Sequence, residues 1–179
     1  MLPSPHPHVF WLFGLSGAGK STLANLLLEE LRTRDIPVLA LDGDTVRSGL
    51  CQGLGYSDAD RAENLRRAAE AAKLGIQSGL CVVASFITPL ESHRRLVAGI
   101  LGPSLSFIHV SAPLEVCRAR DVKGLYAGAE AGKVARMTGI SSGFEVPSRA
   151  DFTLLTAQQS IETCGAQLAG FARGRLSPR

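Results

Sequence analysis

Five short, almost wholly apolar runs alternate along the chain with segments of helical periodicity. The runs span residues 9–13, 38–41, 80–84, 105–110 and 152–156, and each has the length of a buried strand. After the first run, leucines recur at positions 23, 27 and 31, as on one face of a helix. Further helices are expected near 57–76, 91–100, 113–120 and 161–171, the first of these beginning with Ser57 as N-cap and Asp60 three residues on. This order predicts an α/β fold with a five-stranded, mostly parallel sheet covered by helices on both faces.

The segment 121–149 interrupts this alternation. It contains five glycines, several basic residues and no convincing strand. A loop of this length inside a compact domain is typically a functional lid or a disordered segment, and the basic residues favour a lid. Because the chain shows no linker or internal repeat, we expect one domain over residues 1–179, with a flexible tail at 1–8 and a lid region at about 121–149.

Composition and charge narrow the class of protein. The chain is 45% hydrophobic and 20% charged, as in globular domains. Its 19 basic and 16 acidic residues are too evenly balanced for a dedicated nucleic-acid binder, and no apolar stretch approaches the roughly 20 residues of a membrane span. The four dispersed cysteines form no CxxC pair. We therefore expect a cytoplasmic protein with reduced thiols and with neither nucleic acid nor membrane as a partner.

The first apolar run leads into a phosphate-binding pattern. Residues 14–21 read GLSGAGKS, which matches GxxxxGK[ST] between a strand and an amphipathic helix. Glycines allow backbone N–H groups to turn toward phosphates, Lys20 should reach the β- and γ-phosphates of ATP, and Ser21 should bind Mg²⁺. A glycine-rich turn without a ligand is the alternative. The expected ATP-binding residues are Gly14, Leu15, Ser16, Gly17, Ala18, Gly19, Lys20, Ser21 and Thr22.

Two carboxylates follow the second apolar run. Asp42 and Asp44 lie where ligands bind in parallel α/β sheets, at the carboxyl end of a strand. They are suited to holding Mg²⁺ or to accepting a proton from a hydroxyl nucleophile. The third run ends at Ala84 and Ser85 without an acidic residue. Asp42 and Asp44 are therefore the candidates for binding the metal ion. A solvated Asp-Gly turn is the alternative.

Several arginines come after these acids. Arg61, Asn64 and Arg66, near the start of an expected helix, are suited to clamping an anion and a sugar hydroxyl. An exposed, charged helix face explains the same spacing equally well.

Several separate motifs together resemble the adenylylsulfate kinase family. They occur in family order over about residues 9–150: 14–22, 41–44 with Arg47, 53–67 (GLGYSDADRAENLRR), 84–89 (ASFITP), 113–126 (PLEVCRARDVKGLY), 138–140, and 144–145 with Pro147. The resemblance implies a homodimeric P-loop kinase of sulfate assimilation that uses ATP and Mg²⁺. Its reaction would convert adenylyl sulfate to 3′-phosphoadenylyl sulfate, with ADP as the second product.

The resemblance also implies the roles of individual residues. Asp44 would lie beside the attacking hydroxyl, Lys123 near the transferring phosphate, and Tyr56 against the acceptor adenine. The implied catalytic residues are Asp44, Lys20, Lys123 and Thr88, and the implied metal-binding residues are Ser21 and Asp42. The implied acceptor-binding residues are Asp42, Asp44, Arg47, Tyr56, Arg61, Asn64, Phe86, Ile87, Thr88, Lys123, Gly124, Leu125 and Met137.

Two positions depart from the family pattern. Met137 replaces a second aromatic residue that commonly sandwiches the acceptor adenine, and we expect weaker acceptor binding by about 1 kcal/mol. Thr88 stands where the family usually has a serine that has been considered as a phosphorylated intermediate. We expect direct in-line transfer, with Thr88 shaping the pocket.

Two other functions fit parts of the sequence. A different small-molecule P-loop kinase, acting on a nucleoside monophosphate or a sugar acid, would share the nucleotide half. A catalytically weak nucleotide-binding module would bind ATP without acceptor-dependent turnover. The combination of Lys20, Ser21 and Asp44 with Lys123 argues against the weak module.

Overall fold

A single parallel sheet forms the centre of the molecule. The computed structural model describes residues 6–121, 124–130, 138 and 143–177. Within them the strands are β1 (Val9–Phe13), β2 (Val38–Asp42), β3 (Cys81–Phe86), β4 (Leu105–Ser111) and β5 (Phe152–Leu155). Their order is β2-β3-β1-β4-β5, and every pairing is parallel. The predicted five-stranded sheet is confirmed, with no antiparallel pair among these strands.

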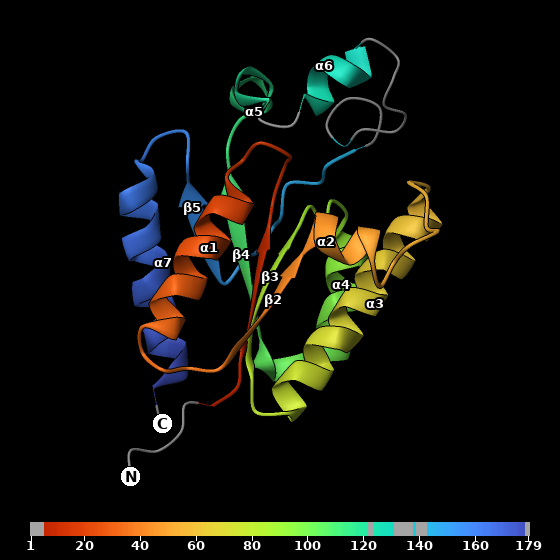
Figure 1. Cartoon of the computed structure of the whole chain (residues 1–179). Helices are drawn as coiled ribbons and strands as arrows, with labels where there is room; N and C mark the ends of the chain where they lie inside the picture. Colours follow the sequence, from red (N-terminus) through yellow and green to blue (C-terminus); the bar gives the residue numbers. More distant parts are fainter. Residues whose placement is uncertain (1–5, 122–123, 131–137, 139–142, 178–179) are drawn as a thin grey trace.

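Helices cover both faces of the sheet (Figure 1). One face carries α1 (Lys20–Arg32) and α7 (Ile161–Leu176), and the other carries α3 (Asp58–Gln77) and α4 (Glu91–Leu101). A 3₁₀ turn, Gly102–Ser104, connects α4 to β4. The remaining helices are short, namely α2 (Gly43–Ser48), α5 (Leu114–Arg120) and α6 (Leu125–Glu130). Both α5 and α6 lie beyond the carboxyl ends of the strands, at the opposite end of the molecule from the two chain termini.

Strand β1 explains why the strands read as continuous apolar runs. All five of its residues are fully buried, because β1 is central and both faces of the sheet are covered. Phe10 and Leu12 pack in the cluster that includes the leucines of α1, whereas Trp11 and Phe13 pack in the cluster that includes the alanines of α3. This central strand therefore fixes the position of the glycine-rich loop that follows it.

The structure differs from the sequence-based expectation in four places. No helix was expected directly after β2, where the structure has α2, and part of the expected lid forms α6. Strand β3 continues to Phe86. His8, which the expected tail included, is buried, and its ring forms a hydrogen bond of 2.9 Å with Ser106 Oγ. The predicted capping box of Ser57 and Asp60 is confirmed at the start of α3.

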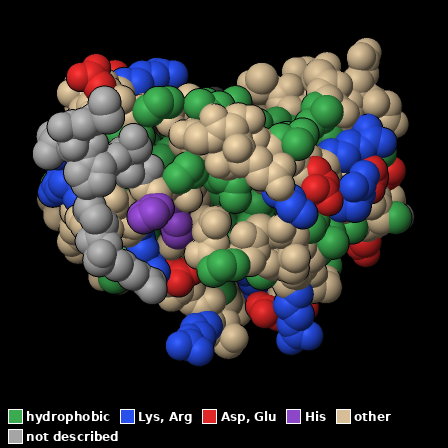
Figure 2. All heavy atoms as spheres, turned by 90° about the horizontal axis from the view of Figure 1, so that it is seen from below, with side chains coloured by type: hydrophobic (Ala, Val, Ile, Leu, Met, Phe, Trp, Pro, Cys, Tyr) green, Lys and Arg blue, Asp and Glu red, His purple; other side chains and the backbone are tan. Residues whose placement is uncertain are grey.

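Charges are mixed on the face seen from the end where both termini lie. Lys and Arg side chains there are interspersed with Asp and Glu rather than gathered in one patch (Figure 2). Of the helices formed by the described residues, none has the length and apolar character needed to span a bilayer.

Candidate functional site

A cavity of about 790 Å³ opens at the carboxyl edge of the sheet. It is lined by the glycine-rich loop, the end of β2, the start of α3, the residues after β3 and the start of α6. Among the residues expected to bind ligands, the lining contains Ser16, Gly17, Ala18, Gly19, Lys20, Ser21, Thr22, Asp42, Asp44, Arg47, Tyr56, Arg61, Asn64, Phe86, Ile87, Thr88 and Leu125. Gly14, Leu15 and Gly124 are not part of the lining, and Lys123 and Met137 lie outside the described residues.

Two glycines in the phosphate loop occupy positions that no other residue fits. Gly17 has a φ of 78°, and a Cβ there would lie 2.8 Å from the carbonyl oxygen of Cys117. A Cβ on Gly14 would collide with the carbonyl oxygen of Val110. The loop therefore packs against the backbone of β4 and α5 at distances that require glycine.

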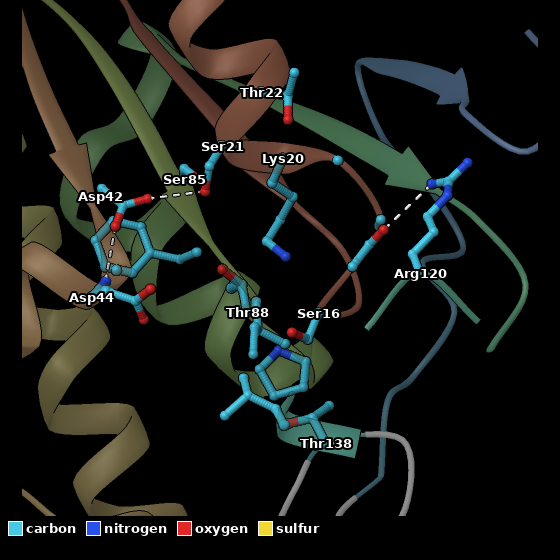
Figure 3. Close-up of a pocket in the computed structure, with 18 of the residues that line it drawn as sticks. Ser16, Lys20, Ser21, Thr22, Asp42, Asp44, Ser85, Thr88, Arg120 and Thr138 are labelled. Carbon is cyan, nitrogen blue, oxygen red and sulfur yellow. Dashed lines mark hydrogen bonds between the residues drawn. The ribbon is translucent and has the colours of Figure 1, made fainter. Parts of the chain in front are cut away.

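Ser21 and Asp42 point toward each other at the start of α1, and Lys20 lies beside Ser21 in the chain (Figure 3). Lys20 extends into the cavity, and its Nζ donates to the carbonyl of Leu15 at 2.7 Å. Ser21 Oγ donates to Asp42 Oδ2 at 3.1 Å, while Asp42 Oδ1 accepts from the backbone N–H of Asp44 at 3.0 Å. Asp42 is the N-cap of α2, so it positions Asp44 in the first turn of that helix.

The residues around Asp42 fit a magnesium ion. Ser85 is the register partner of Asp42 on the neighbouring strand and also lines the cavity. Its buried hydroxyl oxygen has no hydrogen-bond partner among the described residues. Two hydroxyls and a carboxylate are the hard oxygen ligands that Mg²⁺ prefers. The sequence predicted Ser21 and Asp42 for this role but not Ser85.

Another part of the cavity, which the sequence predicted to bind the acceptor, is built from side chains of α2, α3 and the loop between them. The Arg47 guanidinium lies 4.5 Å from the centroid of the Tyr56 ring, and its Nη2 donates to Asn64 Oδ1 at 3.3 Å. Asn64 is only 5% exposed. Its Nδ2 lacks a hydrogen-bond partner in the described part of the chain, although the residue borders the cavity. This amide is therefore available to an acceptor group of a ligand.

Arg61 connects α3 to the segment that was expected to form a lid. Its Nε donates to the carbonyl of Tyr56 at 3.1 Å, and its Nη1 donates to Thr138 Oγ1 at 2.7 Å. Arg66 was expected beside it but is exposed and forms ion pairs with Glu63 instead. Arg66 therefore contributes nothing to the proposed clamp, because it lies on the solvent side of α3.

Thr88 lies in the wall of the cavity. The residue is 1% exposed, with a φ of 43°, and its Oγ1 accepts a hydrogen bond of 2.9 Å from the indole of Trp11. The buried Arg94 donates to its carbonyl oxygen at 3.2 Å. These contacts fix the backbone between β3 and α4 around the end of the cavity.

A family model described as adenylylsulphate kinase matches residues 6–155 of the chain. The chain belongs to this family. A curated adenylyl-sulfate kinase from Marinobacter nauticus is 46% identical over 171 residues, which cover 94% of this chain and 85% of the relative. Another, from Yersinia pestis, is 47% identical over 169 residues, which cover 93% of this chain and 78% of the relative.

Solved structures support the same membership. The structure of the Mycobacterium tuberculosis APS kinase in complex with AMPPNP and APS is 38% identical, with a TM-score of 0.90. The match covers 94% of this chain and 99% of that one. A sugar kinase from Janibacter sp. HTCC2649 is 22% identical with a TM-score of 0.59, and this likeness shows the fold alone.

Several lining residues of this adenylylsulphate kinase family member were not expected from the sequence. They are Ser85, Arg120, Tyr126, Thr138, Thr156, Gln159 and Ile161. Thr156 directly follows β5, as Asp42 ends β2, so the rule that ligands bind at the carboxyl edge of a parallel sheet could have identified it. Arg120 and Tyr126 fall inside the motif at 113–126, which assigned a role only to neighbouring residues.

Proposed function

We propose that this chain transfers the γ-phosphate of ATP in line onto the ribose 3′-hydroxyl of adenylyl sulfate. The adenylyl-sulfate kinase activity follows from membership of the family. In-line transfer between two bound nucleotides is supported by one observation. A single cavity is lined both by the phosphate loop and by the cluster of Arg47, Arg61 and Asn64. We therefore expect the cavity to hold two nucleotides with their reacting ends facing each other.

Asp44 is the proposed proton acceptor. It lines the cavity from the first turn of α2, whose start is capped by the Asp42 side chain. In the transfer, a bond forms between the 3′-oxygen and the γ-phosphorus, and the bond from the γ-phosphorus to the bridging oxygen of ADP breaks. The hydroxyl proton passes to the Asp44 carboxylate. Lys20 stabilises the charge that develops on the phosphoryl oxygens.

Arg47, Arg61 and Asn64 are proposed to bind the acceptor. Guanidinium groups suit the phosphate and sulfate oxygens, and the unpartnered Asn64 Nδ2 suits a further acceptor oxygen. Tyr56 is 55% exposed, so its ring offers a surface for stacking of a base. Roles for Lys123, Gly124 and Met137 rest on the family resemblance alone.

Mg²⁺ is proposed to bind at Ser21 and Asp42, with the Ser85 hydroxyl near it. When bound, the ion would neutralise charge on the phosphates of ATP. Use of ATP as the donor is supported by the mycobacterial relative, whose structure contains AMPPNP together with APS.

The decisive measurement is ADP release against a panel of acceptors. We expect turnover with adenylyl sulfate and at most trace turnover with AMP, a sugar acid or no acceptor. Preference for AMP or for a sugar acid would reassign the acceptor half of the cavity. ATP binding without turnover on any acceptor would favour the weak binding module.

We propose that the phosphate passes directly from ATP to the acceptor and that Thr88 is not phosphorylated on the way. The Trp11 indole occupies one side of the Thr88 hydroxyl, as expected for a residue of the pocket wall. Thr88→Ala should keep most of the activity. Complete loss of turnover in a folded variant that still binds ATP would count against this assignment.

We also propose a homodimer in the cytoplasm. The dimer rests on the family resemblance, and analytical ultracentrifugation would test it. A reducing compartment is supported by the cysteines, all four of which are free and buried. Burial also raises the pKa of the Cys81, Cys117 and Cys164 thiols, which lowers their reactivity.

A further inference from the structure

The carbonyl groups of the phosphate loop have partners drawn from four places in the chain. The Leu15 carbonyl accepts from Lys20 Nζ, as described above. The Ser16 carbonyl accepts from the phenol of Tyr126 at 3.0 Å, and the Ala18 carbonyl accepts from Thr156 Oγ1 at 2.7 Å. Between them, the Gly17 carbonyl accepts from Arg120 Nη1 at 3.3 Å. Four consecutive carbonyls are thus held by side chains.

This pattern matters because the two sides of a peptide group point in opposite directions. A loop that turns its N–H groups toward phosphates must turn its carbonyls away from them. The loop contains three glycines at positive φ, and glycine has more conformational freedom than any other residue. Ordering this loop on binding would therefore cost more conformational entropy than ordering other loops of the same length. Hydrogen bonds to the carbonyls that point away from the phosphates restrict the conformations of the loop before the nucleotide binds.

We propose that Tyr126 and Thr156 are positioning residues that hold the phosphate loop in its binding conformation. They act on the two carbonyls that flank Gly17, one from the first turn of α6 and the other from the residue after β5. The inference rests on the nucleotide half of the proposed function and does not depend on the identity of the acceptor.

Both side chains are themselves firmly held. Tyr126 is 2% exposed, and its backbone N–H donates to Asp121 Oδ1 at 3.0 Å. Burial raises the pKa of its phenol to about 12, so the hydroxyl stays protonated at any working pH. Thr156 is 8% exposed, and its backbone N–H donates to the Ser111 carbonyl at 3.0 Å. The carbonyl oxygen of Thr156 accepts from Arg120 Nη2 at 2.6 Å.

The test uses substitutions that remove only the hydroxyl. In Tyr126→Phe and Thr156→Val, calorimetry should show binding of AMPPNP weakened about 5–20-fold, the scale of one buried carbonyl left without a donor. The KM for ATP should rise in parallel, while kcat at saturating ATP and the KM for adenylyl sulfate stay within about twofold. Thr156→Ser, which keeps the hydroxyl, should restore binding of AMPPNP.

Two controls separate positioning from other causes. Thr153 is an exposed residue of β5, the strand that Thr156 follows, and Thr153→Val should leave nucleotide binding unchanged. Inorganic tripolyphosphate probes the loop without a nucleoside, and the two hydroxyl deletions should weaken its binding as much as that of AMPPNP. Because Thr156 also lines the cavity, weakening of AMPPNP alone would indicate a nucleoside contact and would overturn the inference.

Unchanged AMPPNP affinity in folded variants of both residues would overturn it as well, as would parallel losses of nucleotide and acceptor binding. If Tyr126→Phe fails to fold, Thr156→Val and Thr156→Ser still decide the question. Binding of AMPPNP is measured without an acceptor, so failure of the proposed acceptor chemistry would leave this test intact.

Discussion

The two ends of the cavity are built from different parts of the polypeptide. The proposed nucleotide end is one continuous segment, residues 14–22, and the backbone of its loop is fixed by steric contacts and hydrogen bonds. The proposed acceptor end consists of side chains from α2, α3, the loop between them and Thr138, which touch one another through guanidinium groups, an aromatic ring and an amide. A backbone site tolerates almost no change of shape, whereas a side-chain site can be altered one contact at a time.

Asp44 lines the cavity and is the proposed proton acceptor of the transfer step, so its substitution should have the largest effect. We expect Asp44→Asn to lower kcat about 10³-fold, within the range for loss of a general base, while AMPPNP binding stays near normal. The measurement is kcat with adenylyl sulfate together with the AMPPNP dissociation constant. Turnover close to that of the unmodified chain would remove Asp44 from the transfer step. Loss of AMPPNP binding would instead place it in the nucleotide end.

A single methyl group in the phosphate loop should strongly weaken binding at the nucleotide end. In Gly17→Ala the new Cβ would meet the Cys117 carbonyl at 2.8 Å, and φ is 78°. Strain and overpacking of this kind cost about 3–4 kcal/mol together, so AMPPNP binding should weaken on the order of 10²-fold or more.

Gly53→Ala is the matched control for that substitution. Gly53 also has a positive φ, 91°, but a Cβ there would meet no atom within 4 Å. This variant should lose about 1–2 kcal/mol of stability, because a residue with a Cβ is strained at this φ, and should keep its nucleotide affinity. Equal nucleotide losses in both glycine variants would show that strain anywhere in the chain, rather than the shape of the loop, controls ATP binding.

At the acceptor end, a change of side-chain shape at constant charge should have an intermediate effect. Arg61→Lys keeps the positive charge but loses the fork that reaches the Tyr56 carbonyl and Thr138 together. We expect the KM for adenylyl sulfate to rise about 10–30-fold, equivalent to about 1.5–2 kcal/mol, with the KM for ATP unchanged. Arg66→Lys, on the exposed side of the same helix, should change neither constant. A rise in the KM for ATP would contradict the separation of the two ends.

The same contrast explains what the sequence alone could predict. The strands were predicted to within two residues because buried parallel strands are continuous apolar runs, and the phosphate loop was predicted because its residues are consecutive. Helix α2 was missed, since six residues beginning with glycine carry no helical periodicity. The arrangement of α5, α6 and Thr156 around the loop depends on contacts between residues more than 30 positions apart.

The arginines of α3 show a signal that was present but not used. The sequence-based prediction gave Arg61 and Arg66 the same role because both lie near the start of the helix. Arg61, however, shares its face of the helix with the buried Leu65 and Ala68, at i+4 and i+7. A charged residue in an apolar stripe must have partners, and here these include a backbone carbonyl and Thr138. Arg66, outside that stripe, pairs with Glu63 in solvent.

Substitution of Tyr56 should give the smallest effect, because the residue is 55% exposed. Tyr56→Leu keeps apolar volume and removes the π-face, so we expect the KM for adenylyl sulfate to rise about 3–10-fold, on the scale of one aromatic contact. Tyr56→Phe keeps the ring and separates loss of stacking from loss of the hydroxyl. Because Arg47 lies 4.5 Å from the ring centroid, loss of the ring also frees that guanidinium. If Tyr56→Leu matches Arg61→Lys in its effect, the ring must hold Arg47 in place as well as the base, and the acceptor end would then act as one unit.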